Sequence, residues 1–140
     1  MSKEIYDPIH DFIHITPLMR QVIDTPEFQR LRELKQLGAT YFVFPSATHS
    51  RFAHSLGVSH LAGKLMETLQ KNQKRLQISE RDIELTRIAA LVHDIGHGQF
   101  SHLYDDHIRS CDEDDHEVRG CKTFKKMVTK YQLPLESAEV

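Results

Sequence analysis

The segment Leu91–His102, LVHDIGHGQFSH, holds three histidines and one aspartate within twelve residues. The residues before it predict a helix, because apolar side chains recur there with a helical period. These side chains are Leu85, Ile88, Ala89 and Val92. Gly96 and Gly98 then interrupt the regular backbone. We therefore expect a helix that delivers His93 and Asp94 at its C-terminal end.

Capping residues mark the starts of three helices. Thr16–Pro17 and Thr25–Pro26 each pair an N-cap side chain with proline at the first helical position, where a missing N–H costs nothing. Ser79 and Asp82 are spaced as a capping box. We expect two short helices near the N-terminus and a third that runs from Ser79 into the histidine segment.

The helix after Thr25–Pro26 is expected to end at Gly38, a natural left-handed terminator. Its apolar residues follow at steps of three and are Phe28, Leu31, Leu34 and Leu37. The run Thr40–Pro45, TYFVFP, has the composition of a strand but no pairing partner nearby. We expect it to be an extended connection and do not expect a sheet.

Two longer helices complete the expected fold. One begins at Ser55, and the other covers Glu117–Tyr131. The first has an apolar repeat made of Leu56, Leu61, Ala62, Leu65, Met66 and Leu69. The acidic run Cys111–Asp115, CDEDD, is expected to be a solvated loop. The predicted elements are all helices, so the predicted fold class is all-α.

The length of 140 residues is typical of one domain, so residues 1–140 are expected to form a single unit. A charged content of 27% and a net charge of -2 indicate an ordinary globular protein without general attraction to nucleic acid. No apolar run approaches the ~20 residues that span a bilayer. Cys111 and Cys121 lack CxxC spacing, and the N-terminus does not resemble a signal peptide. We expect a soluble intracellular protein.

The pair His93 and Asp94 predicts a metal site. Both side chains can turn toward one ion at a helix end, and mixed nitrogen and oxygen donors suit a divalent transition metal or manganese. His54, at the entrance of a neighbouring helix, is the best third ligand. Three protein ligands with open positions are typical of a catalytic metal site. Other histidines are individually more typical of surface or hydrogen-bonded core residues, namely His10, His14, His49, His60 and His107.

Longer motifs carry a family resemblance. HDIGHGQFSH, with RFAHSLGV upstream and DHE downstream, resembles the HD-domain phosphohydrolases. DPIH, the stretch Ile23–Val58 and LQISERD are similar to the family of SAM-and-HD-domain deoxynucleoside triphosphate (dNTP) triphosphohydrolases, and this similarity runs from Asp7 to about Phe124. The resemblance implies an HD-domain helical bundle that binds zinc, iron, manganese or magnesium. It also implies cleavage of a dNTP into deoxynucleoside and triphosphate.

The resemblance implies a role for each matching position. The implied metal ligands are His54, His93 and Asp94. The implied catalytic group is His97, His102, Asp105 and His116, and either His102 or His116 would protonate the leaving sugar oxygen. The implied substrate contacts are Gln36, Leu37, Val43, Arg51, His97 and His102. Among these, Arg51 would bind phosphate, and Gln36 would lie near the sugar 3′-hydroxyl.

The resemblance also implies allosteric control and assembly. An activator site for GTP or a dNTP is implied at Lys3, Asp24, Gln29 and Arg32, together with formation of homo-oligomers. The relatives suggest a location in the nucleus or the cytoplasm. Nucleic-acid binding occurs in the wider family, but no basic stripe in this sequence supports it.

The chain departs from the family pattern near its end. The family completes its metal shell with an aspartate on a helix far downstream, whereas this chain stops at Val140. We therefore expect a partial HD domain, truncated at the C-terminus and without a SAM domain. Two alternatives to a working dNTP triphosphohydrolase stay open. One is a nucleotide-binding or assembly module without turnover, and the other is an HD phosphohydrolase that acts on other nucleotides.

Overall fold

The computed structural model of the protein describes residues 3–99 and 115–140. Two strands and five α-helices follow one another in this order: β1 (Lys3–Asp7), β2 (Asp11–Ile15), α1 (Pro17–Ile23), α2 (Pro26–Gln29), α3 (Arg51–Asn72), α4 (Glu80–Val92) and α5 (His116–Tyr131). Short 3₁₀ helices cover Arg30–Glu33, Gly38–Phe42, Lys74–Leu76 and Ser137–Glu139. The described chain is therefore mostly helical, in agreement with the predicted fold class.

The expectation of no sheet is wrong, because β1 and β2 form an antiparallel hairpin. The carboxylate of Asp7 accepts hydrogen bonds from the backbone N–H groups of Ile9 and His10, which stabilises the turn. Ile13 and Ile15 are buried, whereas the residues between and before them on β2 are exposed. This period of two was the signal that the sequence offered for the strand.

The capping prediction for α1 and α2 is confirmed. The Thr16 hydroxyl accepts a hydrogen bond from the N–H of Met19, and the Thr25 hydroxyl accepts one from the N–H of Phe28. The predicted extension of the second helix to Gly38 is wrong, since α2 ends at Gln29 and tightens into a 3₁₀ helix. The chain leaves that helix in extended conformation at Leu34, which ends the helical stripe.

The segment after Leu34 forms a surface loop. A bridge between Lys35 and Ser50 closes this loop at its base. Gly38 has φ 54°, the left-handed conformation expected of it. The expectation of an extended chain over Thr40–Pro45 is wrong, because a 3₁₀ helix covers Gly38–Phe42. Phe42 in this helix and Phe44 after it are exposed, whereas Tyr41 is half-buried.

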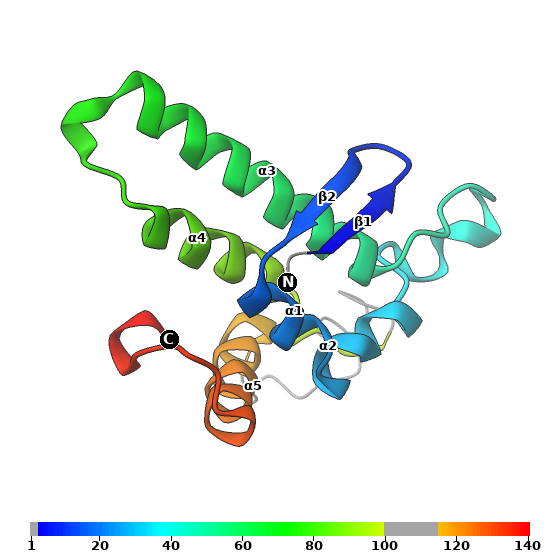
Figure 1. The fold of residues 1–140 in the computed structure, drawn as a ribbon. Helices are drawn as coiled ribbons and strands as arrows, with labels where there is room; N and C mark the ends of the chain where they lie inside the picture. The colour runs from blue at the N-terminus through cyan, green and yellow to red at the C-terminus, as the bar shows by residue number, and fades with distance from the viewer. Residues whose placement is uncertain (1–2, 100–114) are drawn as a thin grey trace.

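α3 and α4 form an antiparallel pair, as Figure 1 shows. α3 begins at Arg51, one turn before the expected start, because the Ser50 hydroxyl accepts a hydrogen bond from the N–H of Ala53. Farther along, the Ser59 hydroxyl donates to the carbonyl of Arg87 across the pair. The capping box at the start of α4 is confirmed. The pairing places the start of α3 beside the end of α4.

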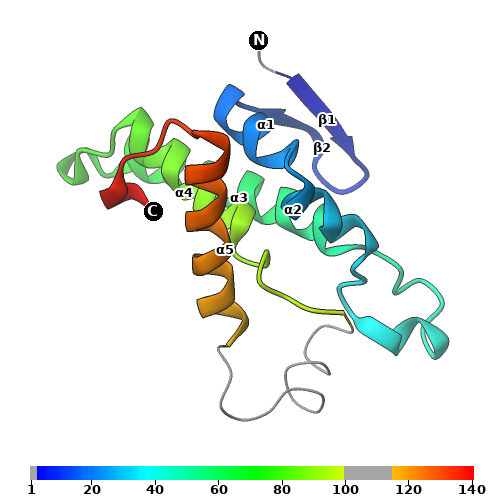
Figure 2. The ribbon, with the colours of Figure 1, turned by 90° about the horizontal axis from the view of Figure 1, so that it is seen from below.

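α5 packs against this assembly from the side opposite the hairpin, as Figure 2 shows. Its buried residues Phe124 and Met127 join one hydrophobic core with residues of β2, α1, α2, α3 and α4. The predicted final helix is therefore confirmed, with His116 as its first residue. Within the described part of the chain, no helix combines the length and the apolar character needed to span a membrane.

Candidate metal centre

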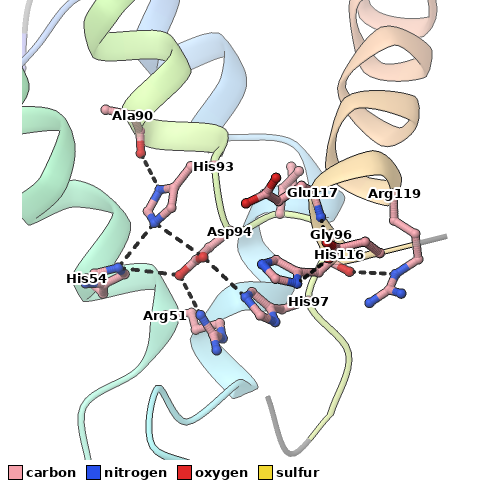
Figure 3. A network of polar contacts seen from close by, with 12 residues as sticks. Arg51, His54, Ala90, His93, Asp94, Gly96, His97, His116, Glu117 and Arg119 are labelled. Carbon is pink, nitrogen blue, oxygen red and sulfur yellow. Dashed lines mark hydrogen bonds and ion pairs between the residues drawn. The ribbon is translucent and has the colours of Figure 1, made fainter. Parts of the chain in front are cut away.

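His54, His93 and Asp94 meet where the end of α4 faces the start of α3 (Figure 3). α4 ends at Val92, so His93 is its C-cap and Asp94 lies in the following turn. His54 occupies the first turn of α3. The turns that follow His93 allow the adjacent side chains of His93 and Asp94 to approach one point, whereas adjacent side chains on a regular helix point about 100° apart.

The spacing of the three side chains fits a divalent ion. The Nε2 atoms of His54 and His93 lie 3.3 Å apart. Oδ2 of Asp94 lies 3.5 Å from the Nε2 of His54, and its other oxygen, Oδ1, lies 3.3 Å from the Nε2 of His93. Two ligands bound ~2.1 Å from one ion at a tetrahedral angle would lie about 3.4 Å apart. The predicted ligands thus converge with the donor types and the spacing that a metal requires.

The surroundings of His93 and His54 suit coordination of an ion through Nε2. The Nδ1 of His93 lies 2.7 Å from the carbonyl oxygen of Ala90. When Nδ1–H donates to this carbonyl, the lone pair of Nε2 faces His54 and Asp94. Burial lowers the pKa of His54, the charge of Asp94 opposes this, and the neighbouring His93 and Arg51 lower the pKa further. A neutral imidazole is the form that binds a metal.

Asp94 lies at the centre of the cluster. The Arg51 guanidinium donates to its Oδ2 at 2.6 Å, and the Nε2 of His97 lies 3.4 Å from its Oδ1. Burial alone would raise the pKa of Asp94, but His97, His93 and Arg51 together lower it well below its ordinary value. The carboxylate is therefore ionised at neutral pH. Arg51 is buried against Asp94, and its predicted phosphate contact stays a prediction.

The turn after Asp94 is held against α5 by close backbone packing. A Cβ atom on Gly96 would lie 2.0 Å from the carbonyl oxygen of His116 and 2.4 Å from the nitrogen of Gly120. Arg119 donates a hydrogen bond from Nε to the carbonyl of Gly96 at 3.0 Å. Only glycine permits this approach, so the first turn of α5 lies directly beside the metal ligands.

His97 and His116 stack on one another across this contact. Their ring centroids lie 4.0 Å apart, with an angle of 19° between the rings. The Nδ1 of His116 lies 2.7 Å from Oδ1 of Asp115, which also accepts the N–H of Glu117 as the N-cap of α5. We expected Asp115 to lie in a solvated loop, and its contact with His116 was not predicted. An aspartate directly before a helix was the available signal.

A cleft of about 360 Å³ leads to the cluster between α4 and α5. Apolar side chains form most of its wall, and the polar end consists of metal-centre residues together with the stacked histidine of α5. Ile88, Val92 and Phe124 line the apolar wall of the cleft. Its polar end is lined by His93, Asp94 and His116. A substrate in this cleft would contact the donor cluster at one end.

The predicted sugar and base contacts do not line this cleft. Gln36, Leu37 and Val43 belong to the loop between the 3₁₀ helix Arg30–Glu33 and α3, where Val43 is 74% exposed. A second cavity of about 250 Å³ is lined by their neighbours Lys35 and Tyr41 and by Gln99 of the histidine segment. The structure thus places this loop near the residues that follow the metal ligands.

The predicted activator residues are spread over the N-terminal part of the fold. Gln29 accepts a hydrogen bond from Arg32 at 2.8 Å, and the Arg32 guanidinium lies 3.6 Å from the ring centroid of Phe52. Asp24 is the C-cap of α1, and Lys3 begins β1. Two further predicted site residues, His102 and Asp105, lie outside the described residues.

The HD domain family model matches residues 51–137, so this chain belongs to the HD domain family. Among characterised proteins, it is similar to the deoxynucleoside triphosphate triphosphohydrolase SAMHD1 of Bos taurus, with 59% identity over 103 residues, 74% of this chain and 18% of that protein. The Gallus gallus protein of the same name is 48% identical over 137 residues, 95% of this chain and 22% of its own.

A more distant organism contributes another similar protein. The SAMHD1 homolog of Dictyostelium discoideum is 53% identical over 104 residues, which is 74% of this chain and 20% of that protein. The chain thus spans about a fifth of the length of these relatives. Because each match extends over 74% of the chain or more, the similarity includes the segments that carry His54, His93 and Asp94.

Proposed function

We propose that this chain carries the metal centre of a dNTP triphosphohydrolase, which converts a dNTP and water into a deoxynucleoside and triphosphate. The convergence of His54, His93 and Asp94 at the polar end of a cleft, with His116 beside them, carries the proposal. The names of the similar proteins support the substrate class. The core shared by β2 and all five α-helices supports a single HD domain.

His54, His93 and Asp94 would hold the divalent ion. Their mixed nitrogen and oxygen donors favour zinc, iron or manganese over magnesium, which prefers oxygen ligands. When bound, such an ion supplies Lewis acidity toward phosphate oxygens and offsets the charge of the triphosphate. Arg51 fixes the Asp94 carboxylate through a buried ion pair, which keeps the ligand ionised and oriented.

His116 would act as the general acid that protonates the leaving group. Hydrolysis forms a bond between the water oxygen and the α-phosphorus and breaks the bond to the sugar O5′, which needs a proton as it departs. His116 lines the cleft, and in its protonated form it would donate that proton from Nε2. Stacking on His97 supports the ring while it transfers the proton. His102, the other predicted donor, lies outside the described residues.

The finer assignments belong to the same proposal. Gln36, Leu37 and Val43 would contact the sugar and base from the surface loop. GTP or a dNTP would activate the enzyme at the residues that the family resemblance indicates, namely Lys3, Asp24, Gln29 and Arg32, and active protein would be a homo-oligomer. The nucleus or the cytoplasm would be its location, which a fluorescent fusion protein in cells would test.

Product analysis tests the proposal. The protein would be incubated with Mn²⁺ and dGTP, with and without GTP, and the products separated by chromatography. We expect deoxyguanosine and triphosphate, faster turnover with GTP, and loss of product in His93→Ala and Asp94→Ala. His14→Ala, on the exposed side of β2, is the matched control and should keep wild-type activity.

Other products would contradict the proposal in different ways. Formation of dGDP and phosphate would assign the cleft to a phosphohydrolase with different bond specificity. Binding of dGTP and Mn²⁺ to folded protein without any product would instead assign it to a nucleotide-binding module. Unchanged turnover in His93→Ala would exclude the proposed metal centre.

A further inference from the structure

The contact between Asp115 and His116 assigns a role to an acidic residue outside the metal cluster. We propose that Asp115 is a positioning residue that holds the Nδ1 proton of His116, so that Nε2 faces the cleft. This inference rests on the proposed function of His116 as a proton donor. The Asp115 carboxylate lies 2.7 Å from Nδ1, which is a short charge-assisted contact.

Two further contacts of His116 within the described residues restrain the ring without choosing its protonated nitrogen. His97 stacks on one face, with 4.0 Å between the ring centroids. The backbone of His116 is fixed against Gly96, where even one added carbon would overlap the carbonyl oxygen. Neither contact distinguishes Nδ1 from Nε2. An ionised carboxylate does distinguish them, because it only accepts hydrogen bonds and so requires Nδ1–H.

This tautomer matches the proposed chemistry. In the protonated ring, Nδ1–H would stay hydrogen-bonded to Asp115, while the proton on Nε2 would pass to the leaving O5′. The neutral ring that remains carries its proton on Nδ1, which is the tautomer that Asp115 favours. The same logic makes an aspartate orient the histidine in serine protease triads. Asp115 is 59% exposed at its side chain, so its effect comes from contact geometry more than from a buried charge.

Asp115 also caps α5, and the test must separate this role from its contact with His116. Its Oδ1 also accepts the N–H of Glu117 and caps α5. Asp115→Ser retains a good capping residue but shortens the side chain, so the contact with Nδ1 is lost. Asp115→Asn keeps both the cap and the reach. Its neutral amide oxygen accepts from Nδ1–H more weakly than a charged carboxylate does, so the preference for one tautomer is weakened.

Nitrogen NMR of the histidine rings reads the tautomer directly. The full chain with ¹⁵N-labelled histidine would be measured above pH 8, where imidazoles are neutral, and His116→Gln would assign the signals of His116. We expect a protonated Nδ1 in the wild type and mixed tautomers in Asp115→Ser and Asp115→Asn, with helical circular dichroism unchanged. The same Nδ1–H tautomer in the wild type and both folded variants would overturn the proposal.

Kinetics provide an independent reading. In the variants we expect kcat for dGTP to fall, with KM unchanged, by no more than the roughly 10²–10⁴-fold contribution of a general acid. Wild-type kcat in Asp115→Ser would also overturn the role. If the wild type shows no hydrolysis at all, the proposed function fails, whereas the NMR result still decides whether Asp115 sets the tautomer of His116.

Discussion

The guanidinium of Arg51 donates to Oδ2 of Asp94 at 2.6 Å, and both side chains are almost completely buried. This ion pair connects the first residue of α3 to the turn after α4. Because the same carboxylate also contacts His54 and His93, Arg51 stabilises the geometry of the whole donor cluster. The candidate metal centre is thus arranged around one carboxylate, not around the histidines alone.

Arg51→Met should destabilise the protein by about 3–5 kcal/mol, because it leaves the buried Asp94 carboxylate without its cation. Urea unfolding in the presence of a chelator would measure this loss without a contribution from bound metal. Arg75→Met, at an exposed position, is the control and should change stability by no more than about 0.5 kcal/mol. Equal stability of the two variants would show that the ion pair does not support the fold.

Gly96→Ala should separate α5 from the metal centre. The added Cβ would overlap backbone atoms of His116 and Gly120 that cannot rotate away, so we expect a loss of about 1–3 kcal/mol or more. Gly120→Ala is the matched control, since its Cβ would lie 3.6 Å from the nearest atom. There, alanine in a helix should be neutral or stabilising by up to ~1 kcal/mol. Thermal unfolding compares them, and equal effects would contradict the proposed close packing.

The ion pair between Arg81 and Glu139 should make stability depend on pH. The hydrogen bond from Arg81 lowers the pKa of Glu139 to about 2, against about 4.3 for an unperturbed glutamate. A lowered pKa in the folded state contributes stability above the unfolded pKa and loses it as pH falls through the folded pKa. The advantage of wild type over Glu139→Gln should therefore be full at pH 7 and vanish between about pH 4.3 and 2.

Unfolding of wild type and Glu139→Gln at a series of pH values would measure this difference. The contributions of all other titrating groups cancel in the difference in unfolding free energy, because both proteins contain those groups. A difference that stays constant down to pH 2 would show that the bridge does not protect the ionised form of Glu139.

Local signals predicted the helix starts correctly. Thr16, Thr25 and Ser79 each accept a backbone hydrogen bond within their own first turn, so neighbouring residues suffice to recognise them. The end of the second helix was predicted wrongly, because its apolar stripe continues to Leu34, which is buried. At that residue the chain turns to pair with the segment around Ser50, and this is a tertiary preference.

The candidate site was predictable only where its residues are neighbours in the sequence or belong to a recognisable motif. His93 and Asp94 are neighbours at a helix end, and His54 became recognisable through its motif. The stack of His97 on His116 joins residues on either side of a long intervening segment, and no periodic pattern marks it. The contact of Asp115 was overlooked because its acidic neighbours gave the segment the composition of a solvated loop.

Metal stoichiometry tests the central claim most directly. Wild type, His93→Ala and His14→Ala would be dialysed to equilibrium against Mn²⁺ or Zn²⁺ at pH 7.5, and the bound metal would be quantified. We expect a single ion per chain in wild type and His14→Ala. In His93→Ala the affinity should fall by more than the roughly 10–100-fold that loss of an outer-shell partner causes. Retention of the ion by His93→Ala with wild-type affinity would contradict the assignment of His54, His93 and Asp94 as the metal centre.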